Sequence, residues 1–313
     1  MTQIVRRLLA GGLVAILLVI LVCGAIFLRA EQRIAAAQQS PAPGDIKKIA
    51  PIPLPPLPPP AIRTVRVAVI GGMVETGFWQ AITAHFTQQT GIKVDLVAAG
   101  PVNGIAPVFK YGGIDLITMH ACDTIINLVA DGYAIDAKPW AKNDLIIVGP
   151  PDDPAHIKGM TDAASALRKI VASKSHFIVH SSVGAREVLQ DIIEPADISL
   201  DLKTTTVLLD DKQRHVLYSA ATDHAYTLIG RIPFLDHKFP NNGMALMVQG
   251  DPRLRRPFVV AVANPARMKD VHLAEARKLE EFLLSPQNQE WIGQFDKGKY
   301  DDQPLFFPIW PRE

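Results

Sequence analysis

The chain has 313 residues, of which 48% are hydrophobic and 20% charged. This length and apolar content exclude a disordered chain and suffice for a buried core. The 32 Lys and Arg residues nearly balance 31 Asp and Glu, leaving a formal charge of +1. A general nucleic-acid-binding protein would carry a strong basic excess, so that class is excluded. The two cysteines exclude a disulfide framework and a cysteine-rich zinc module.

The first 30 residues are predicted to form a membrane element. Leu8–Leu28 is an uncharged apolar run, long enough at about 1.5 Å per residue to cross a hydrocarbon core of roughly 30 Å. We expect residues 1–30 to be a retained single-pass anchor in the inner membrane, with a cytoplasmic N-terminus and the body in the periplasm. Cleavage near Ala35–Ala37 would instead make the segment a signal peptide and release the body. Cys23 leaves a lipoprotein as a third alternative.

Residues 31–60 are predicted to be a linker. Pro51–Pro60 reads PIPLPPLPPP and holds seven prolines in ten residues. Proline fixes its own φ and biases the preceding residue to extended backbone, which predicts a polyproline II helix. At about 3.1 Å per residue this stretch would act as a semi-rigid spacer between the membrane and the body.

The body, residues 61–313, alternates predicted strands with predicted helices. Strands are expected at 64–70, 93–99, 113–119, 145–148, 176–179, 225–228, 244–249 and 258–263. Helices are expected at 78–90, 124–130, 162–172, 181–193, 273–284 and 286–295. This alternation predicts an α/β fold with largely parallel sheets.

Three strand-to-helix junctions are candidate ligand sites. Ligands of α/β folds bind beyond the carboxyl ends of strands, and a helix N-terminus favours anions. The junctions are at residues 71–76, 100–104 and 180–186. A tight turn at the first and an ordinary helix N-cap at Ser182 are the plain structural alternatives.

Catalytic patterns are missing from the sequence. It has no Gly-x-Ser-x-Gly elbow, no phosphate-binding loop with a Gly-Lys-Ser/Thr ending and no His-Glu-x-x-His pair. The nine histidines are scattered, and Cys122 is the only cysteine of the body. We therefore expect a binding protein and not an enzyme, with no cofactor and no metal.

Several stretches of the body resemble the tungstate-binding proteins of bacterial ABC transporters. They are Gly113–Ala121, Asp131–Tyr133, Asn143–Pro154, Ala225–Leu228, Gly250–Leu254, Leu284–Pro286 with Gln289, and Leu305–Pro308. The resemblance implies a two-lobed fold of the type II periplasmic solute-binding class, with the ligand in the cleft between the lobes. Crossovers are expected near Pro150 and Gly250, so that residues 61–150 and 250–313 form one lobe and 151–249 the other.

The same resemblance implies a set of ligand-binding residues. The family's Thr/Ser-rich loop after the first strand is matched by Gly71-Gly72-Met73, and His180 stands where the family has an arginine. The implied set is Gly71, Gly72, Met73, Thr76, His180, Ser181, Ser182, Gly184, Arg186, Thr227 and Arg231. Because several positions depart from the family pattern, we expect a divergent site. If His180 faces the cleft, anion binding should strengthen as the pH falls through its reference pKa of about 6.5.

Two functions remain at this point. One is an extracytoplasmic solute-binding protein that delivers a small anionic solute, a tungstate-like oxyanion or a relative, to an inner-membrane ABC permease. The other is a membrane-tethered, repurposed binding domain that acts in sensing or protein interaction without transport. The membrane would be contacted through Leu8–Leu28 in either case.

Overall fold

The computed structural model describes residues 63–209 and 212–309. The chain divides into a unit of residues 1–60 and a compact unit of residues 61–313. The predicted anchor and proline-rich linker lie outside the described residues. Within the described ranges, no helix combines the length and apolar character that crossing a membrane requires.

The first lobe is built on a sheet whose strands run in the order β2-β1-β3-β9-β4. The first three of these strands are parallel to one another, whereas β9 runs antiparallel to its neighbours β3 and β4. The strands are β1 (Thr64–Ile70), β2 (Lys93–Gly100), β3 (Leu116–His120), β4 (Ala134–Gly149), β9 (Arg255–Ala263) and the short β10 (Phe307–Pro308).

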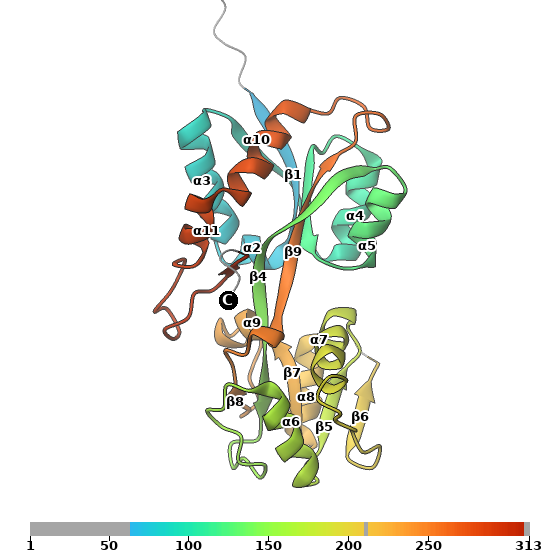
Figure 1. Cartoon of the computed structure of the whole chain (residues 1–313), viewed down its shortest axis with the longest axis vertical. Coiled ribbons are helices and arrows are strands. Elements are labelled where there is room, and N and C mark those ends of the chain that lie inside the picture. The colour runs from blue at the N-terminus through green and yellow to red at the C-terminus, as the bar shows by residue number, and fades with distance from the viewer. Residues whose placement is uncertain (1–62, 210–211, 310–313) are drawn as a thin grey trace, which may run out of the picture. The chain divides into compact units, whose positions relative to one another are not determined.

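Helices cover both faces of this sheet. In Figure 1, α3, α10 and α11 lie on one side of β1, and α4 and α5 lie on the other. The helices of the lobe are α2 (Gly71–Glu75), α3 (Phe78–Thr90), α4 (Val102–Tyr111), α5 (Asp123–Ala130), α10 (Leu273–Leu284) and α11 (Pro286–Ile292). Helices on both faces explain why β1 and β3 read as nearly continuous apolar runs.

The second lobe has its own sheet, in which β5, β6 and β7 are parallel. Its strands are β5 (Phe177–His180), β6 (Thr205–Leu208), β7 (Tyr226–Gly230) and β8 (Ala245–Val248). Its helices are α6 (Ala163–Ala172), α7 (Val183–Ile193), α8 (Gln213–Thr222) and α9 (Arg231–Leu235), with a 3-10 turn at Pro252–Leu254.

Strand β4 belongs to both lobes. It pairs with β9 as far as Asp144 and with β7 from Leu145 onward, antiparallel in each case. The sequence predicted only residues 145–148 as a strand, whereas β4 begins at Ala134 and passes through Pro139 with register shifts. The sheets are thus mixed rather than largely parallel, because the strands that join the lobes run against their neighbours. Figure 1 shows β4 and β9 running side by side between the lobes.

The hydrophobic core is divided in the same way. The first lobe packs around an aromatic group in which Phe78 stacks on Phe306, with ring centroids 4.0 Å apart, and on Trp140 at 5.9 Å. In the second lobe, Leu145 and Ile147 of β4 belong to one cluster, and Ile146 and Val148 belong to the cluster on the other face of the sheet. Successive strand residues point to opposite faces, so a continuous apolar run fills both clusters.

Gly149, at the end of β4, has no room for a side chain. A Cβ there would lie 2.3 Å from the ring of Tyr226. That ring is held in place, because the Tyr226 hydroxyl donates to Asp153 Oδ1 at 2.7 Å and accepts from the Ala155 N–H at 2.9 Å. We expect Gly149→Ala to lower the free energy of unfolding by about 1–3 kcal/mol through overpacking, measured by urea denaturation.

Gly104→Ala is the matched comparison for this prediction. Gly104 lies inside α4, and a Cβ there would approach a neighbour no closer than 3.7 Å. Because alanine favours the helix by up to about 1 kcal/mol, this variant should be neutral or more stable. Equal stabilities of the two variants would contradict the packing described for Gly149.

Candidate functional site

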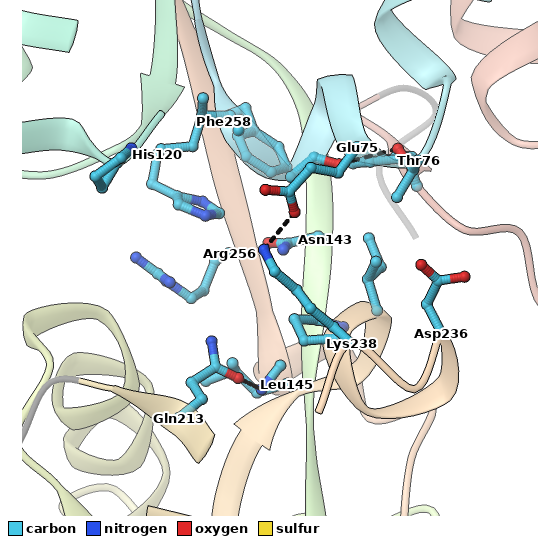
Figure 2. A pocket seen from close by; sticks show the side chains of 18 of the residues that line it. Glu75, Thr76, His120, Asn143, Leu145, Gln213, Asp236, Lys238, Arg256 and Phe258 are labelled. Atoms are coloured by element: carbon cyan, nitrogen blue, oxygen red, sulfur yellow. Dashed lines mark hydrogen bonds and ion pairs between the residues drawn. The ribbon is translucent and has the colours of Figure 1, made fainter. Parts of the chain in front are cut away.

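A cavity of about 340 Å³ lies where the two lobes meet. It opens at the carboxyl ends of β1, β2, β3 and β7, which is where ligands of α/β folds bind. Figure 2 shows the side chains that surround it. The lining residues that carry the chemistry are Glu75, Thr76, His120, Asn143, Gln213, Asp236, Lys238 and Arg256. Ile70, Leu145, Ile232, Pro233, Phe258 and Phe306 add an apolar surface.

The end of β1 forms one wall of the cavity. Gly71 and Gly72 line it, as the sequence predicted for this junction, although they open helix α2 rather than a turn. A side chain on Gly71 would contact the backbone of Gly100, at the end of β2, at 3.5 Å. Thr76 also lines the cavity, and its hydroxyl donates to the Gly72 carbonyl at 2.9 Å. Met73 is fully buried in the first-lobe core.

Arg256 is a partly buried cation on the wall formed by β9. Its guanidinium lies against the backbone of α7, where a Cβ on Gly184 would be 1.9 Å from Arg256 Cζ. Burial lowers the pKa of Arg256, yet an arginine stays protonated because its ordinary pKa is above 12. Among residues 63–209 and 212–309, no hydrogen bond or ion pair joins a protein group to this guanidinium. The cleft therefore holds a cation whose N–H groups bind no described group, although the charge of Glu187 acts on it.

Asn143 and Arg256 stand next to each other because of strand register. They are directly opposed in the antiparallel pairing of β4 and β9, and opposed residues share one face of a sheet. Asn143 Oδ1 is buried, and no group in the described part of the chain donates a hydrogen bond to it. Since buried polar atoms are almost always paired, such an atom is typical of a functional site rather than of a core.

His120 lies at the end of β3 beside this wall. Its ring stacks on Phe258, with the ring centroids 4.2 Å apart and an interplanar angle of 22°. Burial and the nearby charge of Arg256 hold the pKa of His120 well below its usual value, so the ring is neutral at pH 7. The cleft histidine thus supplies one donor and one acceptor but no charge.

The facing wall carries charged side chains that are already engaged by other protein groups. Glu75 of α2 forms an ion pair with Lys238, which follows α9, and this pair joins the two lobes (Figure 2). Asp236 Oδ1 accepts a hydrogen bond from the Tyr300 hydroxyl at 2.5 Å. Ile232 of α9 packs into the core cluster of the first lobe. The cavity is therefore enclosed by contacts between the lobes.

The predicted residues at the start of α7 do not line the cavity. His180 is buried, with 2% of its surface exposed, and its Nδ1 accepts from the Ser182 N–H at 2.9 Å. Ser182 is at the N-cap position of α7, and Arg186 is exposed. Ser181 is likewise outside the lining. Of this stretch only Gly184 meets the site, through its contact with Arg256, so a pH response through His180 has no geometric support.

Thr227 and Arg231, also in the predicted set, bind the protein itself. Thr227 Oγ1 donates to the Ile178 carbonyl at 2.8 Å and is fully buried. Arg231 donates to Asp301 Oδ1 at 2.6 Å and to the Pro304 carbonyl at 3.1 Å. These contacts tie the start of α9 to the C-terminal segment of the first lobe.

Comparison with known proteins places the chain in a family. The sequence profile of the family described as bacterial extracellular solute-binding protein matches residues 65–295. The chain belongs to this family. That assignment confirms the prediction of a solute-binding protein that is not an enzyme, and the family's members are extracellular or periplasmic.

Individual family members show the likeness in more detail. The tungstate-binding protein TupA of Peptoclostridium acidaminophilum is 27% identical over 276 residues, which are 87% of this chain and 91% of that protein. A Haloferax volcanii protein provisionally named an ABC transporter anion-binding protein is 29% identical over 254 residues, 79% of this chain and 72% of its own. The solved structure of tungstate-binding TupA from Desulfovibrio alaskensis superposes with a TM-score of 0.64 at 24% identity, over 79% of this chain and 98% of that one. The predicted resemblance and the α/β solute-binding fold are thus confirmed.

The sequence reasoning missed the charged lining of this cavity. Arg256, Glu75, Lys238 and His120 were not in the predicted set, although all four line the cavity. A signal existed for one of them, because Arg255-Arg256 open strand β9, whose later residues are buried, at the return to the first lobe. Glu75 and Lys238 are 163 positions apart, and only the folded lobes bring them together.

Asp144 lies at the point where β4 passes from one sheet to the other. It is buried, and its nearest cation, Arg231 Nε at 4.0 Å, gives its other N–H groups to Asp301 and Pro304. The described residues give these carboxylate oxygens no hydrogen bond beyond the one from the Asp144 N–H itself. Burial therefore raises the pKa of Asp144 from its ordinary 3.8 to about 6.

This raised pKa predicts a pH-dependent stability. The folded chain keeps the Asp144 proton up to about pH 6, whereas the unfolded chain loses it near pH 3.8. The folded state binds more protons between these values, so the free energy of unfolding falls as the pH rises through them. The fall is up to about 3 kcal/mol, because one pKa unit corresponds to about 1.4 kcal/mol. Asp144→Asn should remove this part of the pH dependence in urea unfolding, and an unchanged slope between pH 4 and about 6.5 would contradict it.

Proposed function

We propose that this protein is an extracytoplasmic solute-binding protein that delivers a small anionic solute, a tungstate-like oxyanion or a relative, to an inner-membrane ABC permease. The observation that carries the proposal is the Arg256 guanidinium, which lines the cavity and has no hydrogen-bond or ion-pair partner in the described ranges. An anion in the cavity would supply the missing partner.

An anion is expected to bind at Arg256 because an unpaired charge away from water is energetically unfavourable. Removing a charged group from water is unfavourable unless it is paired, and a charge-assisted hydrogen bond is roughly twice as strong as a neutral one. Arginine presents a planar set of donors that matches carboxylates and oxyanions. The space for this guanidinium depends on Gly184, since any larger residue would collide with it. The cation is thus held in the cleft by the shape of α7.

The named relatives support the same class of ligand. Two of the proteins to which the chain is similar are named for tungstate binding, and a third for anion binding in an ABC transporter. The structural likeness below 25% identity supports the fold alone. The anionic ligand therefore rests on Arg256 and on the sequence relatives together.

The decisive variant is Arg256→Gln. The full chain, purified in detergent, is titrated with tungstate, sulfate, phosphate, acetate and butyrate while its melting temperature is followed. A ligand at 100 times its Kd should add about 2.7 kcal/mol of stability, a readily measured shift. Loss of a hydrogen-bonded charge should weaken every anion that binds by roughly 10- to 100-fold. Arg256→Lys keeps the charge but loses the planar set of donors, so its anion affinity should lie between those of the unchanged protein and Arg256→Gln.

Arg168→Gln is the matched control. Arg168 is exposed on α6, donates to the Ala196 carbonyl and does not line the cavity. It should bind anions as the unchanged protein does. Anion binding that survives Arg256→Gln at full strength would refute the proposed function.

The membrane anchor is the second part of the proposal. The uncharged run Leu8–Leu28 and the proline-rich stretch after it support a body held at a distance from the inner membrane. Burial of about 20 apolar residues in the bilayer makes insertion effectively irreversible. The protein should therefore pellet with inner membranes and resist carbonate extraction. A free periplasmic form whose mature N-terminus is Gln38 would overturn the anchor and leave the binding function intact.

A further inference from the structure

Glu75 and Lys238 form an ion pair that faces the cavity from opposite lobes. Glu75 ends helix α2 of the first lobe, and Lys238 follows helix α9 of the second. Both line the cavity, and Figure 2 shows the two side chains meeting there. The exposed fraction of the side chain is 50% for Glu75 and 52% for Lys238. The pair is therefore open to a solute and is not packed in the core.

This ion pair is held by nothing else. Across residues 63–209 and 212–309, the Lys238 ammonium donates only to Glu75, and the Glu75 carboxylate accepts only from Lys238. Exposed ion pairs contribute little to stability, because water weakens the attraction and two long side chains must be ordered. An anion that enters the cavity can therefore replace the Glu75 carboxylate at Lys238 with little loss of stability.

The other acidic groups near the cavity are placed differently. Asp236 lines the cavity, and its carboxylate accepts a hydrogen bond from the Tyr300 hydroxyl at 2.5 Å. The charge of Glu187 acts on Arg256 from α7, but Glu187 is exposed and does not line the cavity. Glu75 is thus the carboxylate that occupies a cation of the lining.

A tetrahedral dianion is matched by two cations. Arg256 and Lys238 line the same cavity of about 340 Å³, so one solute can lie between them. Hydrogen bonds between ionised groups are roughly twice as strong as neutral ones, and an oxyanion has enough oxygen atoms to accept from both side chains. A second cation adds more to the binding of two negative charges than to the binding of one.

We propose that Lys238 is the second anion-binding cation of the cavity, that a tetrahedral dianion binds between Arg256 and Lys238, and that the Glu75 carboxylate occupies Lys238 until the solute displaces it. The proposal rests on the proposed function, because it takes Arg256 as the first anion-binding group. It adds a cation from the second lobe and a carboxylate that competes with the solute. Lys238 then makes the site selective for dianions over monoanions of the same shape.

Matched tetrahedral anions test the role of Lys238. The full chain in detergent is titrated calorimetrically at neutral pH with tungstate and sulfate, which are dianions, and with perrhenate and perchlorate, which are monoanions. Lys238→Gln should weaken the dianions by about 10- to 100-fold and the monoanions by less than about threefold. Lys238→Arg keeps the charge, so its dianion affinities should stay within about threefold of those of the unchanged protein.

Lys278→Gln is the matched control for Lys238→Gln. Lys278 is exposed on α10 and lies outside the lining of the cavity. It should change none of the four affinities.

Glu75→Gln separates competition from a purely structural role. Removing the competing carboxylate frees Lys238, so tungstate and sulfate should bind about three- to tenfold more tightly. If the ion pair only held the lobes together, Glu75→Gln and Lys238→Gln would both weaken all four anions by similar factors. Glu281→Gln is the control, because Glu281 is exposed on α10 and outside the lining.

The outcomes distinguish this proposal from the proposed function. Equal losses of dianion and monoanion affinity in Lys238→Gln, with binding still dependent on Arg256, would overturn the second cation and keep the proposed function. No gain in dianion affinity in Glu75→Gln would overturn the competition. No Arg256-dependent binding of any of the four anions would overturn both proposals.

Discussion

The pairing of β4 with β9 is the constraint on which the rest of the structure depends. These strands join the lobes, and β4 is hydrogen-bonded into both sheets. Their register places Asn143 beside Arg256 and Ala141 beside Phe258. A slip of one residue would turn every side chain of the strand to the opposite face. The same hydrogen bonds that hold the lobes together therefore place the polar wall of the cavity.

The pairing of β4 with β9 also determines which charged residues lie where the two lobes join. Asp144 and Arg255 are the next opposed pair in the β4–β9 register, so charged residues are brought to the junction of two buried sheets. Arg231, at the end of β7, is engaged there by Asp301 and Pro304. The lobes thus meet through buried polar contacts rather than through apolar packing alone. Such contacts demand specific partners, which favours one arrangement of the lobes over many.

The sequence predicted most elements of the body because their apolar periodicity is local. Strand 64–70 and helix 273–284 agree with the structure to the residue, and Gly71 and Gly72 do line the cavity. The part of β4 before Leu145 was missed, because Pro139 and the polar residues around it interrupt the apolar alternation of a strand. In the structure, shifts in the register with β9 accommodate these residues within the strand. The cleft itself could not be predicted in detail. Thr227 has the residue type of a ligand, yet its hydroxyl is used inside the sheet, and Glu75 meets Lys238 only after folding.

The cation that lines the cavity stands at a different position from the one that the family resemblance implies. The resemblance places an arginine where this chain has His180, and that histidine is buried against the Ser182 N–H. Under the proposed function, the charge comes instead from Arg256 on β9, which reaches the N-terminal turn of α7 because Gly184 has no side chain. The affinity for an anion depends on the charge and the hydrogen-bond donors near it, and not on which strand carries them. Moving the cation from the second lobe to a strand shared between the lobes would preserve anion binding.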